Sequence, residues 1–283
     1  MRKITILLYI ILCACINSFS QQFITHHYTN KDYKGEQKIW DAKEDNYGRI
    51  WFANNEGIIR FDGNNWTLYR TPTAARHLAF SKSGDLYIAC LGDFGILEFK
   101  QDGSAAYSSL LNQNSLSDKK TGGDENVFIA GDDIYFYMRK HLVTVKKSGN
   151  EYQTLVLPNA GEYAGAFTDD KYLYVNVIGK GLGIIQHGNF SPYKTAIGLE
   201  KYDIIGGMLT TKGLTILSNY NGIFNFKDNL SAGQTSSLNS FAKKGTTAFC
   251  KFKNQQYVIG TLHDGVKIFG NDGSEIYLSL IHI

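Results

Sequence analysis

Short runs of apolar residues alternate along the chain with turns rich in Gly, Asp and Asn. The clearest stretch lies within residues 39–69, where four such runs are separated by three tight connections. Runs of four to eight residues bounded by these turn residues are typical of antiparallel strands. The pattern therefore predicts a four-stranded sheet in this stretch.

The same unit recurs along the chain. A Gly followed by Ile or Val opens the third strand at five positions: Gly57, Gly95, Gly183, Gly222 and Gly265. The intervals are 38, 88, 39 and 43 residues, and 88 is twice 44. The doubled interval contains a copy that lacks the Gly, with strands at 134–137 and 142–145. The chain therefore carries six copies between residues 39 and 277.

Four strands about every 40 residues predict a β-propeller, in which each repeat forms one blade around a central channel. A β-sandwich also has short strands, but it does not repeat at this period. The predicted innermost strands are 77–80, 126–129, 164–167, 204–209 and 246–250, and 112–126 is predicted as an extended loop between blades. We expect an all-β chain of six four-stranded blades, with no helix longer than about two turns and an incompletely sealed ring.

Composition agrees with this fold class. The 283 residues include 18 Tyr and 17 Phe, which favour strands, and 43% of the chain is apolar while 19% is charged. The apolar content excludes a disordered chain, and a single long apolar run excludes a polytopic membrane protein.

That apolar run, residues 4–16, follows two basic residues and precedes Ser18 and Ser20. It predicts a secretory signal over 1–20 and an exported, periplasmic protein. A membrane anchor is the first alternative, although about 13 apolar residues are fewer than the roughly 20 that span a bilayer. A lipoprotein is the second, because 12–15 partly fit a lipobox.

Removal of residues 1–20 takes away two positive charges and no negative ones, so the formal charge falls from +3 to +1. This balance gives no electrostatic basis for nucleic-acid binding. Only Cys90 and Cys250 remain, both in strand-like runs about 160 residues apart. We expect two free, buried thiols.

Residues 39–63 carry Trp40-Asp41, the turn Asp45-Asn46-Tyr47-Gly48, and Trp51 in the second strand. This unit resembles the two-component-regulator propeller repeat, and the other copies match only its skeleton. The resemblance implies the N-terminal periplasmic sensor part of a Bacteroidetes-type regulator, which continues into a triple-tyrosine domain, a membrane helix and a kinase or DNA-binding output.

The resemblance also implies a ring of seven blades, glycan sensing, membrane attachment only through a downstream helix, and a homodimer of the full-length receptor as one option. Family members run longer, and 278–283 look like translated library sequence. We therefore predict an incomplete propeller sensor domain over 21–277, followed by non-native residues 278–283. The repeat itself marks no binding residue.

Motifs for catalysis are missing from the sequence. It has no HExxH, GxSxG or CxxC pattern, and the Gly-rich run 179–183 lies between two strands, where it predicts a hairpin. We therefore expect no catalytic residue, no metal and no cofactor. A secreted propeller enzyme, a lyase or a lactonase, is the alternative, but the predicted inner strands offer almost no carboxylates for its metal.

In a propeller, the loops between second and third strands and the loops between blades meet at one end of the channel. Six residues on these loops are the predicted ligand-binding set: Arg76, Asp93, Arg139, Lys180, Tyr220 and His263. Three of the six are Arg or Lys and one is Asp, so a locally basic face is expected. An oligosaccharide, in particular an anionic or uronic-acid-containing glycan, is the predicted ligand class.

Overall fold

The computed structural model describes residues 26–111, 125–138, 140–149, 151–158, 161–169, 171–186, 188–193, 198–210, 213–226, 230–232, 237–251, 256–270 and 274–279. The predicted signal, most of the predicted loop 112–126 and residues 280–283 lie outside this range. All statements below concern the described residues.

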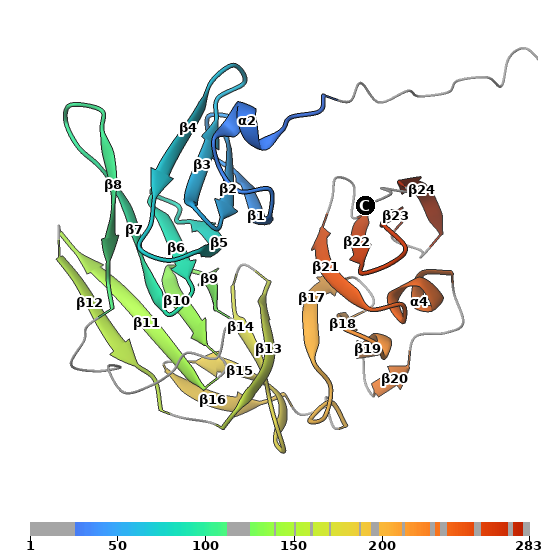
Figure 1. Ribbon diagram of the computed structural model, residues 1–283. Helices are drawn as coiled ribbons and strands as arrows, with labels where there is room; N and C mark the ends of the chain where they lie inside the picture. The colour runs from blue at the N-terminus through green and yellow to red at the C-terminus, as the bar shows by residue number, and fades with distance from the viewer. Residues whose placement is uncertain are drawn as a thin grey trace, which may run out of the picture.

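Six four-stranded antiparallel sheets surround a central axis, as Figure 1 shows. Blade 1 consists of β1 (Ile39–Glu44), β2 (Ile50–Asn54), β3 (Gly57–Phe61) and β4 (Trp66–Arg70). Blade 2 consists of β5 (Ala75–Phe80), β6 (Leu86–Cys90), β7 (Asp93–Phe99) and β8 (Ala105–Ser109). Blade 3 consists of β9 (Asn126–Ala130), β10 (Asp133–Met138), β11 (His141–Ser148) and β12 (Glu151–Val156).

Blade 4 consists of β13 (Tyr163–Thr168), β14 (Leu173–Val177), β15 (Gly181–Gln186) and β16 (Asn189–Pro192). Blade 5 consists of β17 (Ile204–Thr210), β18 (Gly213–Ser218), β19 (Gly222–Phe226) and β20 (Leu230–Ala232). Blade 6 consists of β21 (Thr246–Lys251), β22 (Tyr257–Thr261), β23 (Val266–Phe269) and β24 (Glu275–Ser279). The two described helices are short, α2 (Asn30–Tyr33) and α4 (Ser237–Ala242). The predicted six-bladed, all-β fold is confirmed.

Each apolar core lies between two blades that are consecutive in the sequence. Five clusters of buried side chains join blades 1 and 2, 2 and 3, 3 and 4, 4 and 5, and 5 and 6. Trp51, 1% exposed, stacks on Tyr69 and meets Phe80 of blade 2 edge-on. The alternating strand pattern thus buries both faces of the inner blades, as stacked sheets require.

The turns between first and second strands are held by short polar side chains. Asp45 accepts hydrogen bonds from the backbone N–H groups of Tyr47 and Arg49, from Arg49 Nε (2.6 Å) and from Trp51 Nε1 (2.8 Å). Burial opposes ionisation of this carboxyl, but the hydrogen bonds from Trp51 and Arg49 outweigh it and lower the pKa of Asp45. The predicted turn 45–48 is therefore also an anchor for the core tryptophan.

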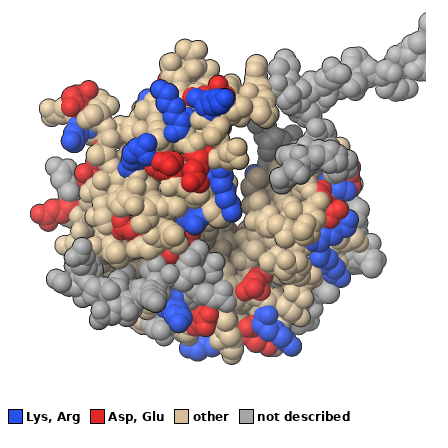
Figure 2. Space-filling model, in the orientation of Figure 1, with Lys and Arg blue, Asp and Glu red and all other residues tan. Residues whose placement is uncertain are grey.

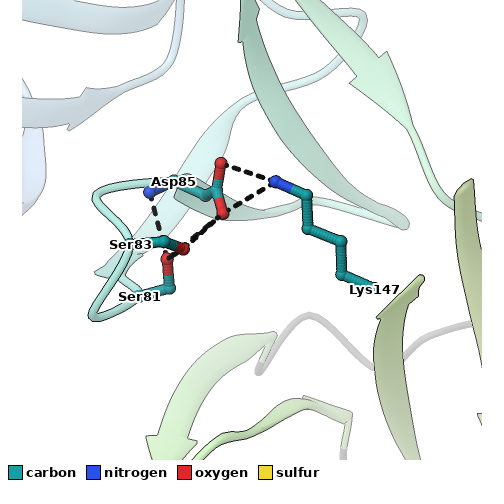
Figure 3. A network of polar contacts seen from close by, with 4 residues as sticks. All are labelled: Ser81, Ser83, Asp85 and Lys147. Atoms are coloured by element: carbon teal, nitrogen blue, oxygen red, sulfur yellow. Dashed lines mark hydrogen bonds and ion pairs between the residues drawn. The ribbon is translucent and has the colours of Figure 1, made fainter. Parts of the chain in front are cut away.

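The corresponding turn of blade 2 connects it to blade 3 (Figure 3). Ser83 Oγ donates to Asp85 (2.7 Å), while the Lys147 ammonium reaches across from β11 to both Asp85 oxygens at 3.0 Å. Burial raises the pKa of Asp85, but the bonds from Ser83 and Lys147 outweigh it, so the pKa is lowered overall. This network ties two blades together at their polar edges.

Residues 26–38, here called the strap, pack on the face of blade 1 that is opposite to the cluster shared with blade 2. Tyr28 and Tyr33 pack on Trp66, which itself stacks on Phe61 at 4.3 Å between ring centroids. The fully buried Asn54 side chain donates to the carbonyls of Glu36 and Lys38 at 2.7 and 2.9 Å. Trp66 of β4 therefore packs against the strap.

The ring has one weak junction, between blade 6 and blade 1, which lie next to each other in Figure 1. Among the described residues no apolar cluster joins these two blades. On the blade 6 sheet, Val258, Val266 and Ile268 share the face opposite to the blade 5 cluster and are only half-buried. The expectation of an incompletely sealed ring agrees with this junction.

Both cysteines are free, but only one prediction of burial is correct. Cys90 is fully buried, and burial raises its pKa to about 12. Cys250 is exposed on β21, because no apolar cluster of the described residues covers that side of blade 6. Partial burial of its thiol raises the pKa, and the nearby Lys43 charge of blade 1 opposes the increase.

Candidate functional site: the mouth of the channel

The turns between second and third strands meet the connections between blades on one face, here called the mouth face. The backbone N–H groups of Leu91, Ile178 and Leu262, at the start of these turns, donate to the carbonyls of Ala74, Glu162 and Gly245 at 2.8, 2.8 and 3.0 Å. The turns of blades 2, 4 and 6 are therefore fixed to the segments that lead into an innermost strand.

Five of the six innermost strands begin with a β-bulge at this face. The register of β1 slips at Trp40, and that of β5 slips at Arg76; β13, β17 and β21 slip at the corresponding place. A bulge re-aims side chains at the end of a strand, and bulges are frequent beside binding sites. In blades 1 and 2 the bulges bring chemically useful side chains together.

Trp40 lies between two cations. The Arg76 guanidinium is 3.6 Å and the Lys38 ammonium 3.7 Å from the centre of its ring. At these distances from the ring centre, the two groups would overlap if they lay over the same face of the ring. They therefore occupy opposite faces of the indole. The ring nitrogen of Trp40 donates to Asn55 Oδ1 at 2.7 Å. The indole thus concentrates two positive charges at the mouth and has no free face for a sugar ring.

Two donor atoms of the Arg76 guanidinium lack a hydrogen-bond acceptor. Its Nε and Nη1 atoms are buried and have no hydrogen-bond partner among the described residues. A buried guanidinium donor without an acceptor is costly, typically by about 1–3 kcal/mol. An anionic acceptor that reached these atoms, after a small movement of the side chain, would remove this cost.

Asp41 and His77 form the second pair at the bulges. His77 Nδ1 lies 3.6 Å from Asp41 Oδ2, and the same oxygen accepts the backbone N–H of Leu78 at 3.0 Å. Burial raises the pKa of Asp41, but the bond from His77 and the Lys43 charge outweigh it, so the pKa is lowered overall. Asp41 therefore stays ionised and joins the inner edges of blades 1 and 2.

A polar depression of about 610 Å³ lies beside this pair of bulges. Strap residues 34–38 line it together with Asn55, Glu56 and Arg70. Arg70 is already paired with Glu56, and Asn55 Nδ2 donates to Glu36. The cations of the lining that have no carboxylate partner are Lys34 and Lys38, so the depression extends the positive site outward from Trp40.

Five of the six predicted site residues are described, and Arg139 lies outside the described residues. By their positions at turns and strand starts, Arg76, Asp93, Lys180, Tyr220 and His263 belong to the mouth face. No hydrogen bond or ion pair joins any two of these five described residues. Asp93 is occupied within blade 2, where its Oδ1 accepts the Ser109 hydroxyl at 2.7 Å. Of these five described residues, only Arg76 is therefore part of a cluster of polar and aromatic side chains that could form a site.

Acidic side chains share the mouth face with the predicted cations. Glu125, Glu162 and Glu200 also lie on the connections of the mouth face, and Lys244 is paired with Asp264 at 3.1 Å. On the face that Figure 2 displays, positive and negative side chains are interspersed around a central hollow. The charge expected from the six predicted site residues left out these acids, so it overstated the positive charge of the mouth face.

The sequence interpretation missed Lys38, Trp40 and Asp41. Trp40 precedes Arg76 by 36 residues, close to one repeat. Alignment of the repeats would have placed these two residues at equivalent positions. The stacking itself had no sequence signal, because it depends on two bulges that re-aim the side chains.

No protein-family model matches the chain, and no curated protein matches it. Within the described residues, no three His, Cys, Asp or Glu side chains converge in a way that could hold a metal ion. No helix of that part of the chain is long and apolar enough to cross a membrane.

Solved structures share the fold. A catalytically inactive variant of virginiamycin B lyase from Staphylococcus aureus with quinupristin aligns with a TM-score of 0.65 at 14% identity, over 91% of this chain and 88% of the lyase. The extracellular domain of the putative hybrid two-component system BT4673 from B. thetaiotaomicron aligns with a TM-score of 0.64 at 14% identity, over 92% of this chain and 34% of that one. The WD40 propeller of Doa1 has a TM-score of 0.63 at 11% identity, with 88% and 84% covered.

These structural similarities show that the chain has a propeller fold, and they do not assign a function to it. Sensor and lyase propellers are both among the neighbours, so the fold is compatible with both functions. A triple-tyrosine regulator is not confirmed by any of the comparisons.

Proposed function

We propose that the chain is the ligand-recognition propeller of an exported signal-transduction regulator and that it binds an anionic glycan at the channel mouth. The observation that carries this proposal is the Arg76 guanidinium, which is stacked on Trp40 and has two buried nitrogens without acceptors. A carboxylate or sulfate group supplies acceptors of the right charge. The adjacent depression, with Lys34 and Lys38, accommodates further residues of the same polymer.

The regulator part of the proposal rests on the first repeat and on the likeness to the BT4673 extracellular domain. In it, the signal over 1–20 directs the chain to the periplasm, and a downstream helix and output domain complete the receptor. A seventh blade completes the ring by packing on the half-buried Val258, Val266 and Ile268 of blade 6. The unpartnered face and the junction beside the strap support this arrangement.

The binding test compares two ligands of equal length, hexagalacturonate and cellohexaose, by isothermal titration of the exported chain. We expect binding of the acidic oligomer only. Arg76→Ala should weaken it about 10- to 100-fold, as expected for the loss of a charge-assisted hydrogen bond. Lys82→Ala is the matched control, because Lys82 is a cation of the same blade on the opposite face and pairs with Asp132.

Two results would contradict the proposal. Equal affinity for both oligomers would remove the role of charge, and equal weakening by Lys82→Ala would show a non-specific attraction of the polymer to the protein surface. Absence of binding to a panel of acidic glycans would exclude the glycan class.

A lyase is the second candidate, and His77 is the observation that favours it. The Asp41 carboxylate near Nδ1 favours the tautomer with a basic Nε2, and the His77 side chain is 37% exposed beside Arg76. In an elimination, such a base takes the proton next to a carboxylate while the bond to the leaving oxygen breaks and a C=C bond forms. The ultraviolet absorbance of the unsaturated product, lost in His77→Gln, would establish this activity.

A further inference from the structure

A second buried ionisable group at the mouth lacks a partner, and it is an acid. Glu125, the residue before β9, is only 3% exposed. Its Oε1 atom accepts the backbone N–H of Gly92 at 3.2 Å, whereas its buried Oε2 atom has no hydrogen-bond partner among the described residues. None of the ion pairs between described residues includes it. Because a buried carboxylate oxygen without a partner is costly, a ligand that offers a donor would be stabilised here.

Glu125 and Arg76 are attached to the same turn of blade 2. The N–H of Leu91 donates to the carbonyl of Ala74, which lies two residues before Arg76. The N–H of the next residue, Gly92, donates to Glu125 Oε1. Because consecutive backbone nitrogens are roughly 3–4 Å apart, the Ala74 carbonyl oxygen and Glu125 Oε1 lie within about 10 Å of each other. The two groups without partners therefore flank the mouth end of blade 2.

The buried thiol of this turn shows that the acidic and basic groups adjoin. Burial, followed by the charges of Asp93 and Glu125, raises the pKa of Cys90 to about 12. Two carboxylates act on this one thiol, so the turn is locally acidic. Cys90 pairs with Ala75, the neighbour of Arg76 in the chain. An acidic corner and a basic corner therefore lie side by side at the mouth.

A ligand that carries both charges would supply partners to both groups. The carboxylate of an acidic sugar supplies acceptors to Arg76. An unsubstituted amino group on the adjacent sugar is protonated below its usual pKa of about 8, so it supplies Glu125 with N–H donors and with the opposite charge. A hydroxyl or acetamido group supplies a donor but leaves the charge of the buried carboxylate unpaired. The arrangement therefore favours a sugar amine over a neutral sugar beside the acidic one.

We propose that Glu125 forms a subsite for the free amino group of a zwitterionic glycan, whose neighbouring carboxylate binds Arg76. This inference rests on the proposed function of the Arg76 site, and it narrows the ligand from an anionic to a zwitterionic oligosaccharide. After a small movement of each side chain, binding pairs both buried groups at the mouth end of blade 2.

Isothermal titration of the exported chain with two matched pairs of hexasaccharides tests the subsite. Hyaluronan and heparosan both alternate glucuronate with N-acetylglucosamine, through different linkages. Each is compared with its N-deacetylated form at about pH 6, where the sugar amine is protonated. We expect the free-amine form of at least one pair to bind about 10-fold or more tightly than its N-acetylated counterpart, as for a charge-assisted hydrogen bond.

Glu125→Gln should abolish this preference, because the amide keeps an oxygen for the Gly92 N–H but carries no charge. Glu200→Gln is the matched control and should keep the preference. Glu200 Oε2 also accepts a backbone N–H at the mouth face, from Gly198 at 2.9 Å, but in the connection between blades 4 and 5. Arg76→Ala should weaken the binding of both forms alike. Thermal unfolding followed by circular dichroism verifies that each variant is folded.

Three results overturn the inference: N-deacetylation that strengthens binding in neither pair, a preference that survives in Glu125→Gln, or a preference that Glu200→Gln removes equally. Failure of the proposed function looks different, because hexagalacturonate then does not bind or binds independently of Arg76, and the Glu125 subsite is rejected with it. If hexagalacturonate binds through Arg76 and the free amine adds nothing, the Arg76 site stands and only the Glu125 subsite is wrong.

Discussion

Replacement of Asp45 should destabilise the propeller through Trp51. In Asp45→Ala the indole N–H of Trp51, a residue that is 1% exposed, loses its acceptor. A buried donor without a partner costs about 1–3 kcal/mol. The half-exposed Arg49 and two backbone N–H groups of the turn lose their acceptor as well, and because water can replace it there, they add about 1 kcal/mol together.

We therefore expect Asp45→Ala to lower the free energy of unfolding by about 3 kcal/mol. Asp45→Asn, which keeps one oxygen for Trp51, should lower it by about half as much. Urea unfolding followed by far-UV circular dichroism measures both, provided that the slope m is unchanged. Asp62→Ala is the control, because Asp62 also accepts two turn N–H groups but stands in an exposed turn, and its effect should be much smaller.

A double-mutant cycle with Trp51→Phe isolates the indole contact. The cost of Asp45→Ala should shrink when the N–H donor is already missing. If the cost is the same in both backgrounds, or if Asp45→Ala changes stability by less than about 0.5 kcal/mol, the anchoring role of this turn is refuted.

Three further predictions concern other parts of the ring. Gly165→Ala should lower the melting temperature far more than Gly84→Ala, because both have positive φ but only at Gly165 would the new Cβ lie 2.1 Å from a backbone oxygen; equal effects would show strain alone to be the cause. A thiol reagent should modify Cys250 and leave Cys90 untouched until the protein unfolds, and rapid labelling of Cys90 in the native protein would contradict its burial. Because the pKa of Asp85 is lowered in the folded state, its contribution to stability is present above the unfolded pKa near 4 and is lost as pH falls through the lower folded value, so Asp85→Asn should flatten the acid side of the stability profile.

The sequence predicted the blades because each is a local structure. Strand runs and Gly turns lie within about 30 residues of each other, and the predicted inner strand 246–250 differs from β21 by one residue. The strap escaped prediction because its polar sequence has no strand or helix period, and its position depends on Asn54 and Trp66, which follow it in the chain.

The candidate site was predicted less well than the fold. Loop position led to the mouth face and to Arg76, but it also selected Asp93, whose carboxylate accepts the Ser109 hydroxyl within its own blade. Contacts between blades, such as Arg76 on Trp40, depend on bulges whose register has no sequence signature. Contacts between side chains of different blades could therefore be identified only from the structure.

The five apolar clusters, each shared by blades that follow one another in the sequence, have a consequence for the order of assembly. A blade can bury its inner face as soon as the next one has been synthesised, without waiting for the end of the chain. The strap, which emerges before any blade, is ready to shield blade 1 at once. Loss of structure should then begin at blade 6, which a single cluster of the described residues joins to the ring. This blade should show the fastest amide exchange of the six.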